Sequence, residues 1–257
     1  MVWLLQIPAP LLLEVQSWER PPLDGVEQAL ALPALPPNLV PRAAAVMPAL
    51  LQLLRQPEAS LQEMVSKVQR DTLLTTEVLR MARSPLYGTE QTVDSRETAI
   101  SRIGVSGLQS AMAKVVLKPL FSAQTTGLTG RAGPRIWIHA ERQAQQAMAL
   151  ADATGLDRFD GFLVGPLHGA GRTAVLRLLD RQGMQLQWPW SLAFDQALQL
   201  AGHRLFGRLL MEWAISPSLT ALGQALTQYP LQIEPASLEW IAIESERLTT
   251  ASLTPRH

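Results

Sequence analysis

The chain has 257 residues, and its 22 Lys and Arg residues balance 22 Asp and Glu residues, so no long-range positive field attracts nucleic acid or anionic lipid. Hydrophobic residues make up 47% of the chain and charged residues 17%, a composition that is typical of a folded helical protein and excludes an intrinsically disordered one. The absence of cysteine excludes disulfides, thiolate metal sites and thiol nucleophiles, and it agrees with the cytoplasmic location that we expect.

Residues 1–35 form a predicted amino-terminal extension, which begins with the apolar stretch MVWLLQIPAPLLLEV. No basic residue precedes this stretch, Pro8 and Pro10 interrupt it, and Glu14 ends it, so it fits neither a signal peptide nor a membrane-spanning helix. It also lacks the basic face of a membrane-surface anchor. We therefore expect the extension to pack on the body of the protein, and we expect no membrane partner.

Residues 36–121 form a predicted amino-terminal helical part. Apolar residues recur here at spacings of three and four, and few stretches alternate with period two. The same pattern continues to the end of the chain, which predicts an all-α fold. In this part we expect Asp71 to cap one helix and Gly104 to end another. The predicted helices are 38–56, a short helix after the capping box of Ser60 and Glu63, 71–84, 94–104 and 106–121.

Residues 122–134, SAQTTGLTGRAGP, are rich in glycine and threonine and lack an apolar period, which predicts a linker or loop. Residues 135–257 then form a second helical part with carboxy-terminal helices. Its predicted helices are 135–154, 158–168, 171–182, 191–201, 203–214, 218–228 and 235–249.

Residues 60–84 allow a second interpretation, as a helix-turn-helix with TLLTTEVLRMARS as its recognition helix. The second helix, however, has an apolar face that includes Leu74, Val78 and Met81, and the chain has no net positive charge. Core packing is therefore favoured over DNA binding, and we expect no nucleic-acid partner.

Three histidines of the second half, His139, His168 and His203, each lie near an end of a predicted helix. Two interpretations stay open. The histidines are hydrogen-bonding side chains that fill the space between helix ends, or they line a pocket that binds a ligand or a pH-dependent partner.

Several segments, in this order and spacing, resemble the HDOD domain, the HD-related output domain of bacterial signalling proteins. The resemblance covers about residues 33–225 and implies an HD-like helical bundle with an amino-terminal helical subdomain. It rests on a proline-rich entry from LPALPPNLVP, then AISRIGVSGLQSAMAKVV, IWIHAERQAQQAMALA, DGFLVGPLHGAGRTAVL and AGHRLFGRLLMEWAISPSL.

The resemblance also implies where a hydrolytic site would lie. In catalytic HD phosphohydrolases an aspartate follows the central histidine, and this pair holds a metal ion with an earlier histidine and a distant aspartate. Here Gly169 follows His168, and no aspartate occurs after Asp195. We expect no metal, no cofactor and no catalysis, with His139, His168, Gly169 and His203 as a vestigial pocket. Zinc held by three converging imidazoles is the alternative.

Two further expectations concern the neighbours of His168. Gly169 and Gly171 are expected to end one helix and to start the next, because glycine accepts positive φ. Arg172 is expected to face solvent or to contact an anion in the groove. Of the later acidic residues, Glu212, Glu234, Glu239, Glu244 and Glu246 lie in contexts unlike that of the family's last ligand, so none is expected to act as one.

The function that we expect is that of a non-catalytic regulatory module in bacterial signal transduction, a pseudoenzyme that binds a response regulator, a kinase or a cyclic-dinucleotide enzyme. Trp188 and Trp190, in QLQWPWSLAF, are candidate partner contacts, although both rings could instead fill a cleft between helices. Homodimer formation stays open. The alternative is a degenerate metal-dependent phosphohydrolase that acts on a nucleotide or a cyclic dinucleotide.

Overall fold

The computed structural model describes residues 1–10, 12–36, 39–40, 43–55, 61–84, 95–122, 126–183, 188–228 and 233–253. These residues form helices and no strand, so the predicted all-α fold is confirmed. The helices are α1 Val2–Leu5, α2 Arg20–Ala31, α3 Ala43–Arg55, α4 Leu61–Arg70, α5 Thr72–Ala82, α6 Arg96–Leu117, α7 Pro119–Ser122, α8 Gly127–Thr154, α9 Arg158–Arg181, α10 Leu192–Trp213, α11 Pro217–Thr227 and α12 Leu238–Leu253. The predicted cap at Ser60 and the predicted helix start at Asp94 lie outside the described residues.

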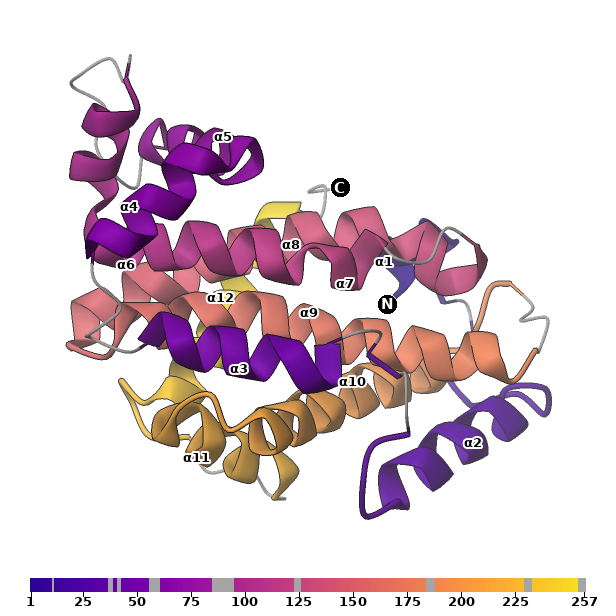
Figure 1. Ribbon diagram of the computed structural model, residues 1–257. Coiled ribbons are helices and arrows are strands. Elements are labelled where there is room, and N and C mark those ends of the chain that lie inside the picture. Colours follow the sequence, from indigo (N-terminus) through magenta and orange to yellow (C-terminus); the bar gives the residue numbers. More distant parts are fainter. Residues whose placement is uncertain are drawn as a thin grey trace.

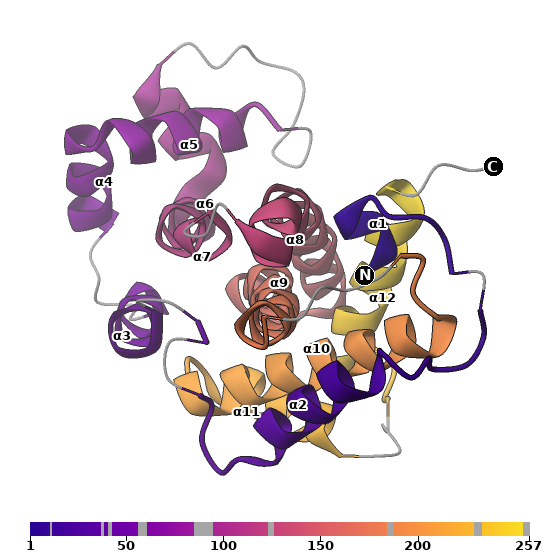
Figure 2. The same ribbon diagram turned by 90° about the vertical axis from the view of Figure 1, so that its right-hand side faces the viewer.

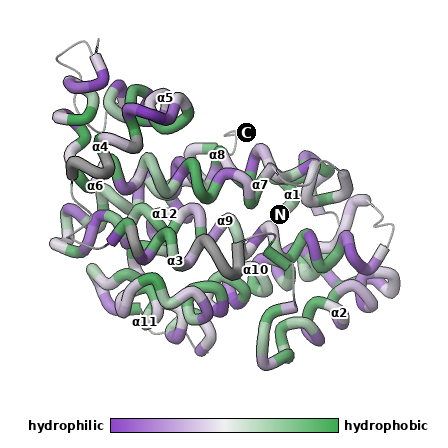
Figure 3. The backbone as a smooth tube through the Cα atoms, in the orientation of Figure 1, coloured by the Kyte–Doolittle hydropathy of each residue, from purple (hydrophilic) through white to green (hydrophobic). Residues whose placement is uncertain are grey.

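Helix α9 is the central element of the bundle. Every residue from Phe159 to Leu179 is buried, which requires apolar or small residues on all sides of the helix. Figure 2 shows α9 end-on, with α3, α6, α8, α10 and α12 arranged around it. The outer helices carry alternating hydrophobic and hydrophilic stretches, as expected for helices that turn one face to the core (Figure 3).

Helices α4 and α5 and the first part of α6 form a small subdomain beside the bundle (Figure 1). It has a separate apolar core, made by Val68, Leu74, Val78, Met81, Ala82, Ala99, Ile103, Leu108 and Ala111. Asp71 caps α5 as predicted, because its side chain accepts hydrogen bonds from the amides of Leu73 and Leu74. Gly104 interrupts α6 with φ 63°, so the predicted break is confirmed.

The predicted linker or loop at 122–134 is wrong for residues 127–134, which form the first two turns of α8. The N-cap residue Thr126 makes no side-chain capping hydrogen bond, and the cap comes instead from far along the chain. The carboxylate of Asp180 accepts hydrogen bonds from the amides of Leu128 and Thr129, at 2.7 and 3.0 Å. The small residues Ala132 and Gly133 face the core in this segment, so its buried side carries little hydrophobic signal.

The predicted helix ends at Gly169 and Gly171 are also wrong, since α9 runs without interruption through both residues. A Cβ atom at Gly171 would lie 2.5 Å from the carbonyl oxygen of Gly202 in α10. One at Gly169 would lie 3.0–3.3 Å from side chains that include Phe121 and Ala140. Both glycines therefore permit close helix packing rather than a turn. Helix α10 likewise joins the two helices that we predicted over 191–214.

The amino-terminal extension packs on the body of the protein, as predicted. Met1, Leu4 and Leu5 are buried in the main core, and the Val2 amide donates a hydrogen bond to Asp195 of α10 at 3.1 Å. Within the described part of the chain, every helix is too short or too polar to cross a membrane.

Candidate functional site

The three predicted histidines converge from three helices, but none of them lies at a helix end. His139 is in the middle of α8, His168 in the middle of α9 and His203 in the middle of α10. The rings of His168 and His203 lie 4.8 Å apart, and His168 also stacks on Phe206 at 5.2 Å. The structure therefore brings the predicted residues together but corrects their place in the helices.

Arg172 lies inside this cluster instead of facing solvent. Arg172 lies one turn of α9 after His168 and is 8% exposed, and its guanidinium donates a hydrogen bond to Nδ1 of His139 at 3.0 Å. The same guanidinium pairs with the carboxylate of Glu246 from α12. Because a guanidinium only donates, Nδ1 of His139 is an acceptor, and the ring proton is on Nε2. Nε2 lies 3.3 Å from the Thr250 hydroxyl and 3.4 Å from Glu246.

Gln143 orients His168. It lies one turn of α8 after His139, is fully buried, and donates hydrogen bonds from its amide nitrogen to Ala242 and Ser245 of α12. Its carbonyl oxygen therefore accepts a hydrogen bond from Nδ1 of His168, at 3.2 Å. Nε2 of His168 is left without a hydrogen-bond partner among the described residues.

The electrostatics of the cluster favour neutral imidazoles. Burial, followed by the Arg172 charge, lowers the pKa of His139 to about 4. The same two causes lower the pKa of His203, and they hold that of His168 well below its usual value. Burial by itself would raise the pKa of Glu246, but the nearby Arg172 and His139 hold it below its ordinary value. The cluster is thus an ionised Arg–Glu pair among uncharged rings.

Helix α1 lies beside α8 and α12 (Figure 2) and covers one side of the cluster. The indole of Trp3 packs on the ring of His139, with centroids 5.2 Å apart. The Arg135 guanidinium donates a hydrogen bond to the Leu4 carbonyl at 3.3 Å, which holds α1 against α8. The segment that we interpreted as a packing extension is therefore a wall of the histidine cluster.

The residues do not fit the metal ion that the family resemblance implies. Gly169 supplies no ligand, and a carboxylate there would face Phe121, Ile136 and Ala140. Nε2 of His168 and one carboxylate oxygen of Glu246 are buried without a hydrogen-bond partner and could ligate a cation, but the Arg172 charge is paired with Glu246. No group of three or more His, Asp or Glu side chains in the described ranges is arranged to hold a metal ion. In this arrangement the three imidazoles form no ligand set for zinc.

Glu246 and Gln143 are the site residues that sequence reasoning missed. We excluded Glu246 because its sequence context is unlike that of the family's last ligand, yet α12 brings it to within 3.6 Å of Nδ1 of His168. No local pattern marks Glu246. Gln143 has a weak signal, since it follows His139 by four residues and so lies on the same helix face.

The two tryptophans that we predicted as partner contacts differ in exposure. Trp190 is fully buried and packs edge-on against Phe194, so it fills the space between helices and makes no surface contact. Trp188 is 38% exposed and packs on Trp190 with ring centroids 5.1 Å apart. Trp188 alone stays a candidate contact.

Two crystal structures have similar folds. An HDOD domain protein with unknown function from Geobacter sulfurreducens matches with a TM-score of 0.59 and 19% identity, over 90% of this chain and 78% of that chain. A protein from Shewanella amazonensis SB2B, provisionally described as a metal-dependent phosphohydrolase, matches with a TM-score of 0.62 and 19% identity, over 93% and 86%. At these identities the matches show the fold alone.

Sequence comparison gives the family. An uncharacterized protein of Treponema pallidum (strain Nichols) is 24% identical over 134 residues, which is 51% of this chain but only 25% of that protein. The family model of the HDOD domain matches residues 40–227, well over half of the chain. Apart from most of the proline-rich entry at residues 32–41, the segments that carried the resemblance lie within this match, and the chain belongs to the HDOD domain family.

Proposed function

We propose that the chain is a non-catalytic regulatory module that acts in bacterial signal transduction by binding another protein. The observation that carries the proposal is the place of Arg172, whose guanidinium lies between His139 and Glu246. This guanidinium neutralises the Glu246 carboxylate and repels a second cation. The proposal therefore takes the cluster as one in which no divalent cation polarises a phosphate.

An exposed apolar surface near Trp188 supports binding to a protein. Backbone hydrogen bonds from Leu192 to Leu12 and from Ala193 to Leu13, at 2.8 and 3.1 Å, place the two leucines beside the start of α10. The exposed fractions of Leu12, Leu13 and Leu192 are 48%, 75% and 39%. We group these leucines with Trp188, which lies four residues before Leu192, as the Leu13 patch; exposed apolar side chains of this kind are typical of a protein contact. A response regulator, a kinase or a cyclic-dinucleotide enzyme is the kind of partner that we propose.

The alternative function is that of a degenerate phosphohydrolase acting on a nucleotide or cyclic dinucleotide. One observation favours it, namely that Glu246 lies within 3.4 Å of His139 and 3.6 Å of His168. This proximity supplies an acidic group that the motif lacks. The alternative requires that Arg172 leave the cluster.

Site-specific photo-crosslinking tests the proposal. A benzoylphenylalanine at position 188 should form a covalent adduct with a signalling protein in the native host, because this position lies in the Leu13 patch. The matched control is position 200, since Leu200 is 53% exposed on α10 but is not part of the Leu13 patch. Leu13→Asp should lower the yield of the adduct at position 188 without lowering the melting temperature.

Two results would contradict the proposal. The first is crosslinking of the same proteins, with the same yield, from positions 188 and 200. The second is hydrolysis of a nucleotide or cyclic dinucleotide that depends on added manganese or iron and is lost in His168→Ala. That second result would establish the phosphohydrolase instead.

A further inference from the structure

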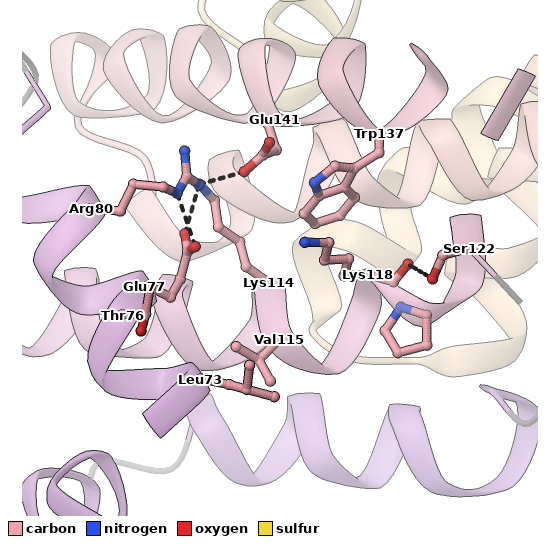
Figure 4. A pocket seen from close by; sticks show the side chains of 11 residues that line it. Leu73, Thr76, Glu77, Arg80, Lys114, Val115, Lys118, Ser122, Trp137 and Glu141 are labelled. Carbon is pink, nitrogen blue, oxygen red and sulfur yellow. Dashed lines mark hydrogen bonds and ion pairs between the residues drawn. The ribbon is translucent and has the colours of Figure 1, made fainter. Parts of the chain in front are cut away.

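A cavity of about 620 Å³ lies between the small subdomain and the bundle, with walls from α5, α6, α7 and α8 (Figure 4). Trp137 and Glu141 of α8 line it. These residues lie about 200° around the helix from His139 and Gln143, so α8 separates the cavity from the histidine cluster. Ligand sites of small molecules have volumes of roughly 300 to 1,000 Å³. The cavity is thus a second candidate site, of suitable size, and it is independent of the proposed function.

One end of the cavity carries four charges that neutralise one another. The carboxylates of Glu77 and Glu141 both pair with the Arg80 guanidinium, and both lie near the Lys114 ammonium, at 3.3 and 3.2 Å (Figure 4). Lys114 is only 3% exposed. Because two positive charges meet two negative charges, this end offers no net attraction to an ion.

Lys118 gives the cavity its net positive charge. It is exposed, it follows Lys114 by one helical turn, and no carboxylate of the described residues forms an ion pair with it. Figure 4 shows its ammonium group turned toward the Trp137 indole. The cavity therefore presents one positive charge beside an aromatic surface.

The rest of the wall is apolar. The Trp137 indole is fixed by packing on Phe121, with ring centroids 5.2 Å apart. Leu73 lines the cavity and is 70% exposed, so its side chain has apolar area that a ligand would cover. Val115 and Pro119 complete this surface.

We propose that this cavity binds a small aromatic molecule that carries a single negative charge. The acidic group contacts Lys118, and the ring lies against Trp137 and Leu73. We infer a single charge because Lys118 is a cation without a carboxylate partner among the described residues, and we infer a ring because the Trp137 indole offers a surface on which a ring can stack. Covering this wall provides the hydrophobic contribution to affinity.

Two dyes test both halves of the proposal on the full chain. 8-Anilinonaphthalene-1-sulfonate carries the ring and one negative charge, and N-phenyl-1-naphthylamine has the same rings without the sulfonate. We expect saturable binding of the anionic dye in a fluorescence titration. Lys118→Glu should weaken binding of this dye about tenfold and leave the neutral dye within roughly twofold, because attraction of one charge becomes repulsion.

Leu73→Ser is the complementary variant and should weaken both dyes, since it removes apolar surface. Lys67→Glu makes the same charge change at another lysine and serves as the control. If Lys118→Glu binds the anionic dye as tightly as the wild type, or if Lys67→Glu weakens it equally, the proposal is wrong.

Dye binding can also be followed by NMR on the wild-type chain, where a variant is needed only to assign a resonance. Reductive methylation with ¹³C-formaldehyde labels accessible lysine amines and keeps their charge, and the chain has three lysines, Lys67, Lys114 and Lys118, of which Lys114 is buried. Lys118→Arg assigns the Lys118 resonance by its loss. The anionic dye should shift this resonance and leave that of Lys67 in place. A shift confined to Lys67 would overturn the proposal.

Discussion

After burial, the charge of Arg172 has the largest effect on the protonation of the three histidines around it. Its guanidinium is a permanent charge, it is buried, and it contacts His139 and Glu246 directly. The charge favours an ionised Glu246 and disfavours protonated His139 and His168. Removing either partner of the pair would leave an uncompensated charge in the core, which is strongly destabilising. The cluster therefore behaves as one electrostatic unit.

The histidines make the stability of the protein depend on pH. His139 has an ordinary pKa of 6.5 and a pKa of about 4 in the fold. Between these values the folded state binds fewer protons than the unfolded state, so the free energy of unfolding rises with pH. The stabilisation is fully present above pH 6.5 and is lost as the pH falls toward 4. His168 and His203, whose pKa values are also lowered, act in the same direction.

We predict that His139→Gln flattens this dependence. The carboxamide can still accept a hydrogen bond from Arg172 and donate one toward Thr250, but it does not titrate. Between pH 4 and 6.5, the slope of the unfolding free energy against pH should fall by up to about 1.4 kcal/mol per unit. Urea denaturation at a series of pH values measures it, and an unchanged slope would contradict the neutral histidine.

Asp160 provides a control with the opposite sign. Burial raises its pKa from 3.8 to about 6, although its pairing with Arg55 partly offsets the effect. Its contribution to stability is fully present below pH 3.8 and is lost as the pH rises through 6. Asp160→Asn should therefore make the slope steeper in the same titration, where His139→Gln makes it shallower.

At the scale of the elements, α9 packs so closely on its neighbours that certain positions accept only glycine. A Cβ atom at Gly165 would lie 2.3 Å from the Ala140 carbonyl oxygen and 2.4 Å from the Ala144 amide nitrogen of α8. A Cβ atom at Gly171 would meet the backbone of α10 in the same way. These contacts bring His139, His168 and His203 to one point between three helices.

We predict that Gly171→Ala destabilises the protein by about 1–3 kcal/mol, although alanine favours a helix by about 1 kcal/mol. Gly202→Ala is the matched control on the opposite helix. Its Cβ atom would be at least 3.6 Å from its nearest neighbours, so this change should be neutral or slightly stabilising. Thermal and urea unfolding measure both variants. Equal effects of the two substitutions would show that the helices are not in close contact at Gly171.

The elements that we predicted wrongly share a physical cause. Glycine occurs both where a turn needs positive φ, as at Gly104, and where two helices pack closely, as at Gly171. The local sequence does not distinguish the two roles. Similarly, the start of α8 depends on Asp180, which lies more than fifty residues later. Helical periodicity is a local property of the sequence, and the helices that it predicts are present in the structure. Contacts between distant segments leave no mark on this periodicity, so they could not be predicted from it.

At the scale of the whole molecule, the protein has two apolar cores of different size. The main core extends from Met1 to Ala242, while the subdomain of α4, α5 and the first part of α6 buries a much smaller set of side chains. We predict that amide hydrogens of α5 exchange faster than those of α9, because fewer buried contacts oppose opening. Hydrogen exchange followed by mass spectrometry measures both. Equal protection of α5 and α9 would mean that the two cores open as one unit.

Part of the site could be predicted from the sequence because the resemblance to the HDOD domain extends over most of the chain. The order and the spacing of its motifs identified His139, His168 and His203 as site residues. Glu246 lies 74 residues after Arg172, and α12 has no motif that would predict their contact. Glu246, the carboxylate that pairs with Arg172, could therefore be found only from the three-dimensional path of the chain and not from a local sequence pattern.

The contribution of α12 affects how fragments of this protein should be cloned. The matched region ends at residue 227, and a fragment cut to residues 40–227 would lack both α12 and α1. Such a truncation would expose the indole-covered side of His139 to water and would leave the guanidinium of Arg172 without its counter-ion. Biochemical work on residues 40–227 alone would thus examine a histidine cluster without two of its walls. Expression plasmids should therefore include α1 and α12.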